Sequence, residues 1–368
     1  MKAPKELSGN VGEWSEVYVF FHILGNPVLI PCDAQLDTCG SPIPVVAIFR
    51  GKGPEGNLSY VLEQGENIEW KVYIDGELKS AVLPEEGKAE AAALLSGILE
   101  THSKGMKFPK AEKFLNYLHD HRLKASGLEK GDITLCVNDI RAGHNITSGF
   151  SIKSYLGADP TLFNANKDAT NLLYQVKGID RATVQAIEDE VKRNPKKKIK
   201  VLMKALNENC AEFTFCGTLN PLLEHNLRYI DLSMPQVLGE LLLTHYVTEA
   251  KYVAVATEIM AERDPLLLGD KELYAYKVKK LLEAVALGMT PGRLWKGDEN
   301  ANGGFIIVKP DGDIVTYHLY NRIELNKYLF EHTYFDHPST GRHEFADLFY
   351  EGDELYLKLA IQIRFSRP

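Results

Sequence analysis

The chain has 368 residues, 45% hydrophobic and 25% charged, which suffices for two or three cores or for one large domain with insertions. Its net charge of −8 gives no general sign of nucleic-acid binding, and no apolar run reaches the ~18 residues that a membrane helix needs. The first residues lack the apolar stretch of a signal peptide, and the five cysteines are an odd number. We therefore expect reduced thiols, a cytoplasmic location and no membrane partner.

The first half of the chain predicts strands between helices. Apolar residues recur at helical spacing over 11–25, as in Trp14, Tyr18 and Phe21. An Asp75-Gly76 turn indicates a hairpin. The expected order is a helix over 11–25, strands over 45–51, 58–64 and 68–79, helices near 85–101 and 109–123, and strands over 132–139, 148–157 and 170–176.

The second half is mainly helical from about 180 to 288 and then returns to strands. A hairpin is expected over 303–319, a short helix over 322–332, a polar loop over 335–345 and a last strand over 355–365. The expected class is therefore α+β, a mixture of helices and strands. We divide the chain into 1–178, 179–290 and 291–368, three regions that can pack as one structural unit.

A lysine stands in an unexpected place in "GFSIKSYLG", where Lys153 lies between strand-forming residues. Burying a lysine is costly unless a partner or a chemical task holds it there. If 132–139 and 148–157 form an antiparallel hairpin, Asp132 opposite Lys153 centres the turn between Ala142 and Gly143. Asp139 opposite Lys153 would leave too short a hairpin. We predict Asp132 as the partner and place Asp139 near the tip.

An aspartate and a lysine on adjoining strands can support phosphodiester hydrolysis, following the logic of the PD-(D/E)XK nucleases. A carboxylate binds Mg²⁺, and a lysine positions or deprotonates the attacking water. Ser151 stands where a second carboxylate is usual. Glu13 and Glu16 on the first helix are the candidates to replace it, although Asn10 gives Glu13 a capping box as an alternative role. Without further support, a surface Asp–Lys cross-strand pair is the better explanation of the pattern.

Five segments occur in an order that resembles the HpaII family of type II restriction endonucleases. They are "GEWSEVYVF", "GDITLCVNDIRAG", "GFSIKSYLGADPTLFNANKDATNLLYQV", "NGGFIIVKPDGDIVTYHLYNR" and "FDHPSTGRHEFADLFYEGDELYLKLAIQIRF". The resemblance implies Mg²⁺-dependent double-strand cleavage of a short palindromic DNA site, with a CCGG-like sequence as the candidate. It also implies a homodimer and a cognate DNA methyltransferase as a genetic partner.

The resemblance assigns roles to residues and regions. Asp132 and Lys153 would be catalytic, and Glu16 would be the displaced acidic residue, with Glu13 as its substitute. Asp132, Glu16 and the backbone carbonyl of Ile152 would hold the metal. The implied fold is a PD-(D/E)XK nuclease core, a mixed sheet flanked by helices, in region 1–178. The mainly helical region 179–290 is then an insertion, and the β-rich region 291–368 would recognise DNA.

Base reading needs donors that reach the edges of the bases. One short loop supplies Ser339, Thr340, Arg342 and His343, and the last strand places Gln362 and Arg364 on one side. Asn302 is a weaker candidate. A solvent-exposed loop and a polar strand face are the alternatives. The basic run 191–204 is either a solvated helix face or a surface that faces phosphates.

Two other functions remain open at this stage. A repair nickase or junction-resolving nuclease could use the same fold. A catalytically inactive, sequence-specific DNA-binding protein would follow if no carboxylate replaced the one missing at Ser151.

Overall fold

The computed structural model describes residues 6–53, 55–65, 67–101, 105–124, 131–139, 143–318 and 321–367. The chain divides into two units. Unit 1 comprises Met1–Pro160 and Glu299–Leu325, and unit 2 comprises Thr161–Asp298 and Asn326–Arg367. Within the described ranges, no helix is both long enough and apolar enough to cross a membrane.

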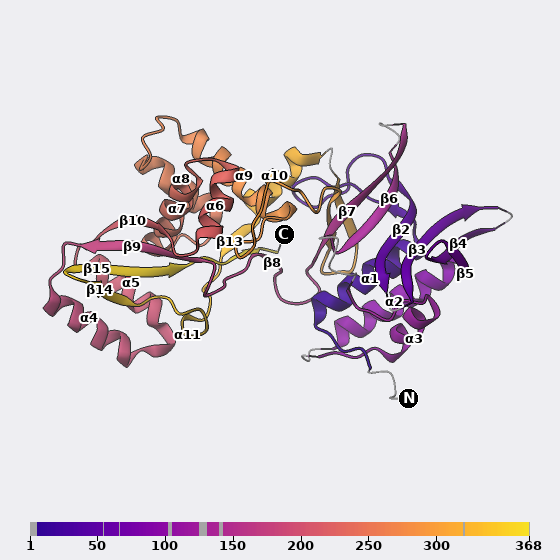
Figure 1. The fold of residues 1–368 in the computed structure, drawn as a ribbon, viewed down its shortest axis with the longest axis horizontal. Coiled ribbons are helices and arrows are strands. Elements are labelled where there is room, and N and C mark those ends of the chain that lie inside the picture. The colour runs from indigo at the N-terminus through magenta and orange to yellow at the C-terminus, as the bar shows by residue number, and fades with distance from the viewer. Residues whose placement is uncertain are drawn as a thin grey trace. The chain divides into compact units, whose positions relative to one another are not determined.

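Unit 1 is built on a large mixed β-sheet (Figure 1). Its strands are β1 (Val28–Leu29), β2 (Ile43–Gly53), β3 (Gly56–Gln64), β4 (Ile68–Ile74), β5 (Glu77–Val82), β6 (Ile133–Asp139), β7 (His144–Ser154), β11 (Gly304–Val308) and β12 (Ile314–His318). They follow the spatial order β12-β11-β7-β6-β2-β3-β4-β5, with β1 paired to β2. Strands β6 and β7 form an antiparallel hairpin, whereas β7 and β11 are parallel. Parallel neighbours need a long crossover, and here most of unit 2 lies in the chain between them.

Helix α1 (Val11–Gly25) is buried on nearly all sides. It contacts β7 and α2 (Pro84–Glu100), and the Phe21 ring packs edge-on against Phe114 of α3 (Pro109–Tyr117). The sequence predicts a single apolar stripe on this helix, but α2 and α3 cover further sides of it (Figure 1). A helix that is apolar all round is a core element. Helix α1 is therefore held firmly beside the sheet.

The return of the chain to unit 1 depends on one glycine. Gly304, the first residue of β11, has φ +112. A Cβ atom there would lie 1.8 Å from the carbonyl oxygen of Tyr317, so no other residue fits without a backbone shift. This close approach lets β11 lie between β12 and β7.

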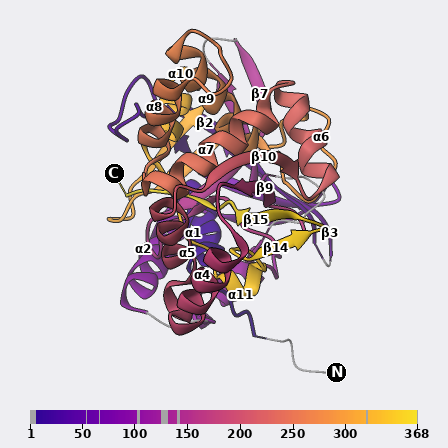
Figure 2. The same cartoon turned by 90° about the vertical axis from the view of Figure 1, so that its left-hand side faces the viewer.

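Unit 2 contains two smaller sheets and most of the remaining helices. Its strands are β8 (Thr161–Phe163), β9 (Asn171–Lys177), β10 (Glu212–Thr218), β13 (Thr333–Phe335), β14 (Leu348–Glu351), β15 (Glu354–Ala360) and β16 (Ile363–Phe365). One sheet has the order β10-β9-β15-β14, seen side by side in Figure 2, and the other has the order β13-β16-β8. The helices are α4 (Arg181–Arg193), η1 (Pro195–Lys197), α5 (Lys198–Glu208), α6 (Pro221–Ile230), α7 (Met234–Thr248), α8 (Val253–Arg263), α9 (Lys271–Leu287) and α11 (Thr340–His343). Helix α10 (Arg322–Glu331) starts in unit 1 and ends in unit 2.

The α+β class, the first helix, the Asp75-Gly76 hairpin and the hairpin of β11 and β12 are confirmed. Three expectations differ. The helix expected to reach residue 123 ends at Tyr117, because Asp120 turns into the core. Strand β10 lies in the region expected to be helical, where the alternation of Phe213 and Phe215 with polar residues is short. The last strand divides into β15 and β16, which belong to different sheets.

The two units also differ from the three consecutive regions expected from the sequence. Strand β11 pairs with β7 in unit 1, whereas β15 pairs with β9 in unit 2. The C-terminal region is therefore shared between the units. This division depends on strand pairings that are distant along the chain, which local sequence patterns do not specify.

Candidate active site

Glu13 and Glu16 are the two acidic residues of helix α1, three positions apart. The N–H of Asn10 donates to Glu13 Oε2 at 2.8 Å, and the N–H of Glu13 donates to Asn10 Oδ1 at 3.0 Å. Glu13 Oε1 lies 3.2 Å from Lys124 Nζ. The predicted capping box is therefore confirmed, and both oxygens of Glu13 have partners.

Glu16 lies one turn further along α1 and is half-buried. Its side chain forms no hydrogen bond and no ion pair with any residue that the structure describes. Burial of the carboxyl, followed by the negative charge of Asp132, raises the pKa of Glu16 to about 8. The two carboxyl groups are therefore within electrostatic range of each other.

Asp132 precedes β6, and the register of its hairpin corrects the sequence-based expectation. Ile133 pairs with Phe150, and the N–H of Asp132 donates to the carbonyl of Phe150 at 2.8 Å. This register places Asp132 opposite Ser151, so the pairing of Asp132 with Lys153 was wrong. The strands meet at Asp139 and His144, and the turn is thus centred one residue earlier than predicted. Asp139 does pair at the tip of the hairpin, as expected.

The Asp132 carboxylate is oriented by β7. Its Oδ2 accepts a hydrogen bond from the backbone N–H of Ile152 at 2.6 Å and another from Ser151 Oγ at 3.0 Å. Its Oδ1 accepts no hydrogen bond from the described part of the chain. Ser151 therefore cannot add a negative charge, but it fixes one oxygen of Asp132 and leaves the other open.

Lys153 lies two residues beyond Ser151 on β7, so both side chains project from the same face of the sheet. Lys153 is half-buried, not fully buried as the sequence suggests. Its Nζ lies 5.6 Å from the centre of the Phe305 ring on β11. No carboxylate of the described residues forms an ion pair with Lys153. The ammonium group therefore keeps its hydrogen-bonding capacity.

A hydroxyl pair joins α1 to β7 beside these residues. Ser15 Oγ and Ser154 Oγ lie 2.8 Å apart, and Ser15 is completely buried. Ser15 precedes Glu16, and Ser154 follows Lys153. The segment just after β7 also packs closely on α1, because a Cβ on Gly157 would lie 3.0 Å from Val11. The position of Glu16 relative to Lys153 is thus set by packing.

Residues 10–365 match the family model described as HpaII restriction endonuclease. The chain belongs to this family. It is 34% identical over 363 residues to the Type II restriction enzyme HpaII of Haemophilus parainfluenzae, which covers 97% of this chain and 98% of that protein. No solved structure matches the chain significantly. Membership of the HpaII family indicates sequence-specific cleavage of DNA by a type II site-specific deoxyribonuclease, with DNA as the partner.

Type II restriction endonucleases generally use a divalent cation, and the acidic residues of this HpaII-family chain fit one. Glu16 and the open Oδ1 of Asp132 supply two carboxylate oxygens, the ligand type that hard divalent cations prefer. Burial is the main cause of the raised pKa of Glu16 and repulsion by Asp132 is the second, and a bound cation would relieve that repulsion. The described residues contain no group of three or more His, Cys, Asp or Glu side chains able to hold a metal. Water and substrate oxygens would have to complete the coordination shell.

The loop expected to read DNA forms the single helical turn α11 in unit 2. Ser339 caps this turn, because its Oγ accepts a hydrogen bond from the N–H of Arg342 at 3.4 Å. Arg342 is exposed, whereas Thr340 and His343 are half-buried. A short helix replaces the predicted loop because Ser339 supplies the cap. DNA contacts of these four residues stay a prediction.

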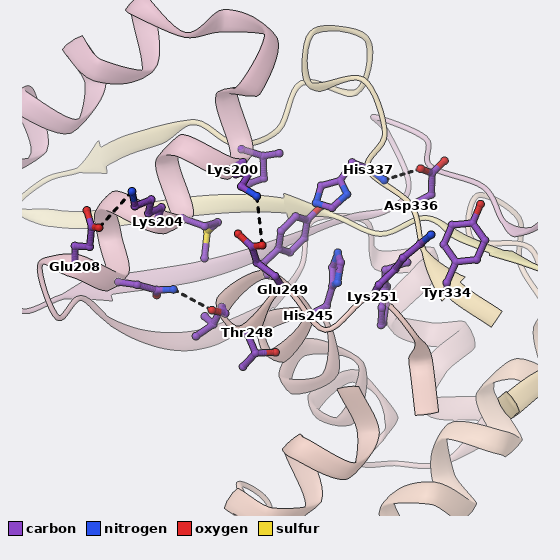
Figure 3. Close-up of a pocket in the computed structure, with 16 residues that line it drawn as sticks. Lys200, Lys204, Glu208, His245, Thr248, Glu249, Lys251, Tyr334, Asp336 and His337 are labelled. Carbon is purple, nitrogen blue, oxygen red and sulfur yellow. Dashed lines mark hydrogen bonds and ion pairs between the residues drawn. The ribbon is translucent and has the colours of Figure 1, made fainter. Parts of the chain in front are cut away.

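Gln362 and Arg364 do lie on the same side, since both donate to Asp336 Oδ2, Gln362 from Nε2 at 3.1 Å and Arg364 from Nε at 2.6 Å. Gln362 is buried, so it could reach a base only after release from Asp336. Asp336 also lines a pocket of about 680 Å³ within unit 2, where its side chain accepts a hydrogen bond from the N–H of His337 (Figure 3).

Asn302, the weaker candidate for a DNA contact, belongs to unit 1. Its Oδ1 accepts a hydrogen bond from the N–H of Gly149 at 3.0 Å, and the N–H of Gly303 donates to the carbonyl of Gly149 at 2.8 Å. The loop before β11 is therefore tied to β7, four residues ahead of Lys153. Asn302 is exposed, so a DNA contact stays a prediction beside this structural role.

The basic run 191–204 contains four lysines that form ion pairs with acidic residues of unit 2. The partners are Lys192 with Asp189, Lys198 with Asp347, Lys200 with Glu249, and Lys204 with Glu208. Figure 3 shows the last two pairs at the rim of the pocket. Exposed pairs of this kind are weak, so both interpretations of the run stay open.

Sequence reasoning missed the residues that hold the candidate site in place. Ser15 and Ser154 carry no motif, and Asp336 is distant from its two partners along the chain. Arg50 is completely buried, and Lys124 is paired with Glu13. The sequence offered one signal for these residues, namely Arg50 within the apolar run 45–51. An arginine in a buried strand requires a partner, although its spacing does not identify Asp120.

Proposed function

We propose that the chain cuts both strands of DNA at a short palindromic site, using Asp132, Glu16 and Lys153 with Mg²⁺. The observation that supports this proposal is that the negative charge of Asp132 acts on the half-buried Glu16 carboxyl, next to Ser15, whose hydroxyl contacts Ser154 of β7. Glu16 would supply the second carboxylate that Ser151 lacks. Glu13 is less suited to this role, because its carboxylate is occupied by Asn10 and Lys124.

The residues of the site would act in separate ways. Asp132 and Glu16 would hold the cation, with the backbone carbonyl of Ile152 as a further ligand. When bound, the cation would activate water and offset negative charge on the scissile phosphate. Ser151 Oγ and the N–H of Ile152 both donate to Asp132 Oδ2, which leaves Oδ1 available for the cation. Lys153, which has no carboxylate partner among the described residues, would donate to the attacking water and orient it towards phosphorus.

Most of the residues proposed to recognise the bases belong to unit 2. Arg342, His343 and Arg364 of unit 2 present donors suited to guanine or to phosphate, with Ser339, Thr340 and Gln362 beside them in the sequence. A palindromic site with a CCGG-like sequence would be read by a homodimer, because each half-site would meet one copy. The enzyme would act in the cytoplasm beside a cognate DNA methyltransferase that protects the host sequence.

Digestion of a sequenced plasmid with Mg²⁺, followed by mapping of the fragment ends, tests this function. We expect defined fragments whose ends share one short palindrome. Nicks in one strand or cutting restricted to branched junctions would instead indicate a repair nuclease. Sequence-specific binding without any cutting would indicate an inactive DNA-binding protein whose site at Ser151 has lost its metal.

A further inference from the structure

Arg50, in β2, forms a buried ion pair with Asp120 next to α1. Both Arg50 and Asp120 are completely buried, and Arg50 Nε donates to Asp120 Oδ2 at 2.7 Å. The Arg50 guanidinium also lies 5.0 Å from the centre of the Phe20 ring of α1. A buried pair of this kind is costly to desolvate, so it is kept where it holds a particular geometry.

The segment held by this ion pair is 120–124. Arg50 Nη2 donates to the carbonyls of Arg122 and Leu123, each at 3.3 Å. In the opposite direction, Arg122 Nη2 donates to the carbonyl of Arg50 at 3.0 Å, and Arg122 Nε donates to Asp120 Oδ1 at 3.0 Å. Leu123 packs so closely against Gly9 that a Cβ on this glycine would lie 2.5 Å from it. The backbone is therefore fixed on both sides immediately before Lys124.

Lys124 extends from this fixed backbone towards the acidic residues of the candidate active site. Its Nζ lies 3.2 Å from Glu13 Oε1, and 58% of its side chain remains exposed. Partial burial lowers the pKa of the Lys124 ammonium, but the hydrogen bond to Glu13 and the charges of Glu13, Glu16 and Asp132 raise it overall. Lys124 thus contacts Glu13 directly and lies within electrostatic range of Glu16 and Asp132.

We propose that Lys124 is a second active-site lysine, which contacts a DNA backbone phosphate beside the Asp132–Glu16 pair. This inference rests on the proposed function and adds a residue to it. An exposed ion pair is worth about 0–1 kcal/mol, so a phosphate can replace Glu13 as the partner of Lys124. Glu13 keeps its hydrogen bond from Asn10 when Lys124 leaves. DNA entering a cluster of carboxylates adds further negative charge, which a second ammonium group offsets.

The alternative role for Lys124 is an exposed ion pair with Glu13 and nothing more. Lys107 provides a matched control, because it also forms an exposed pair in unit 1, with Glu6 at 2.6 Å. The variants to compare are Lys124→Gln, Lys124→Arg and Lys107→Gln. Each changes an exposed side chain, and urea unfolding verifies that all three fold.

The test measures binding of a short fluorescent DNA duplex at several salt concentrations, with Ca²⁺ in place of Mg²⁺, and cleavage of supercoiled plasmid with Mg²⁺. For Lys124→Gln we expect binding to weaken roughly 3- to 20-fold and the salt slope to fall by about one, as for a lost phosphate contact. Lys124→Arg should retain most of the affinity, and Lys107→Gln should match the wild type. Cleavage by Lys124→Gln should slow as well.

Wild-type affinity, salt slope and cleavage rate for Lys124→Gln would overturn the inference. So would an equal loss in Lys107→Gln, since this would indicate a general effect of charge. Lys153→Ala in the same plasmid assay separates this failure from that of the proposed function. If Lys153→Ala still cleaves at the wild-type rate, the catalytic assignment fails. If it is inactive while Lys124→Gln is normal, only the role of Lys124 fails.

Discussion

Ser15 and Ser154 join the two elements of the candidate active site, with their hydroxyl oxygens 2.8 Å apart. The neighbours of these serines, Glu16 and Lys153, come from α1 and β7, which are distant along the chain. A catalytic arrangement loses rate when its groups move by about 1 Å. The hydroxyl pair therefore connects the packing of unit 1 to the chemistry proposed for it.

Replacing Ser154 by alanine should slow cleavage markedly although it lowers the stability of the protein only slightly. The variant loses the hydrogen bond with Ser15 and the one that Ser154 Oγ accepts from the N–H of Leu156, which lowers the free energy of unfolding by about 1–2 kcal/mol. The freed α1 then lets Glu16 shift. We expect a roughly 3- to 30-fold lower single-turnover rate with little change in DNA affinity. The control is Ser96→Ala, at an exposed position of α2 where the hydroxyl donates only to a carbonyl of its own helix. Equal rates for the two variants would contradict the positioning role.

The carboxyl of Glu16 makes stability depend on pH. The folded chain keeps its proton up to about pH 8, whereas the unfolded chain releases it near the ordinary value of 4.5. Between these values the folded state binds more protons, so the free energy of unfolding falls as pH rises. Glu16→Gln should be more stable than the wild type at pH 8, by a few kcal/mol at most, and similar to it near pH 5. Urea unfolding in the presence of a chelator measures this difference.

Added Mg²⁺ should restore the stability that the wild type loses at pH 8, because cation binding requires the deprotonated carboxylate. It should not stabilise Glu16→Gln in the same way. Cleavage should accordingly increase with pH towards 8, with a midpoint that falls as the Mg²⁺ concentration rises. Glu100→Gln, at the exposed end of α2, is the control and should follow the wild type. A stability difference that is the same at both pH values, or equal stabilisation of Glu16→Gln by Mg²⁺, would contradict this account.

Gly149→Ala should disturb the middle of β7, the strand that carries Lys153. A Cβ at this position would lie 2.7 Å from the carbonyl oxygen of Asn300, so the loop that Asn302 ties to β7 must move. We expect a loss of about 1–3 kcal/mol in unfolding free energy and a slower cleavage rate. At Gly65 an added Cβ meets no atom closer than 3.9 Å, so Gly65→Ala should be near neutral. Wild-type stability of Gly149→Ala would show that the loop is not held as described.

Arg364→Ala tests the proposed reading of bases. If Arg364 leaves Asp336 to contact a base edge, the variant should lose about 1–3 kcal/mol in binding its mapped site and little on unrelated DNA. Arg228, which forms an exposed pair with Glu224 within α6, is the matched arginine and should be replaceable by alanine without effect. Equal losses on both DNAs would instead assign Arg364 to a phosphate.

The sequence predicts which helix or strand carries each residue of the candidate site better than it predicts which residues face each other. Helical spacing and the Asn10 cap place Glu16 on α1, and strand patterns place Lys153 on β7. The hairpin register was missed by two residues, because a turn-rich stretch does not specify where its centre lies. The Ser15–Ser154 contact and the Arg50–Asp120 pair could not be predicted, since each joins residues far apart in the chain that no motif links.

The central claim is that Glu16 supplies the carboxylate that Ser151 cannot. The most direct measurement compares Glu16→Gln with the wild type in Mg²⁺-dependent plasmid cleavage and in binding of the same DNA with Ca²⁺. We predict that cleavage by the variant falls by at least about 100-fold, while the protein stays folded and its DNA affinity stays within a few-fold of the wild type. Cleavage by Glu16→Gln at the wild-type rate would contradict this claim. Another residue would then have to supply the second carboxylate.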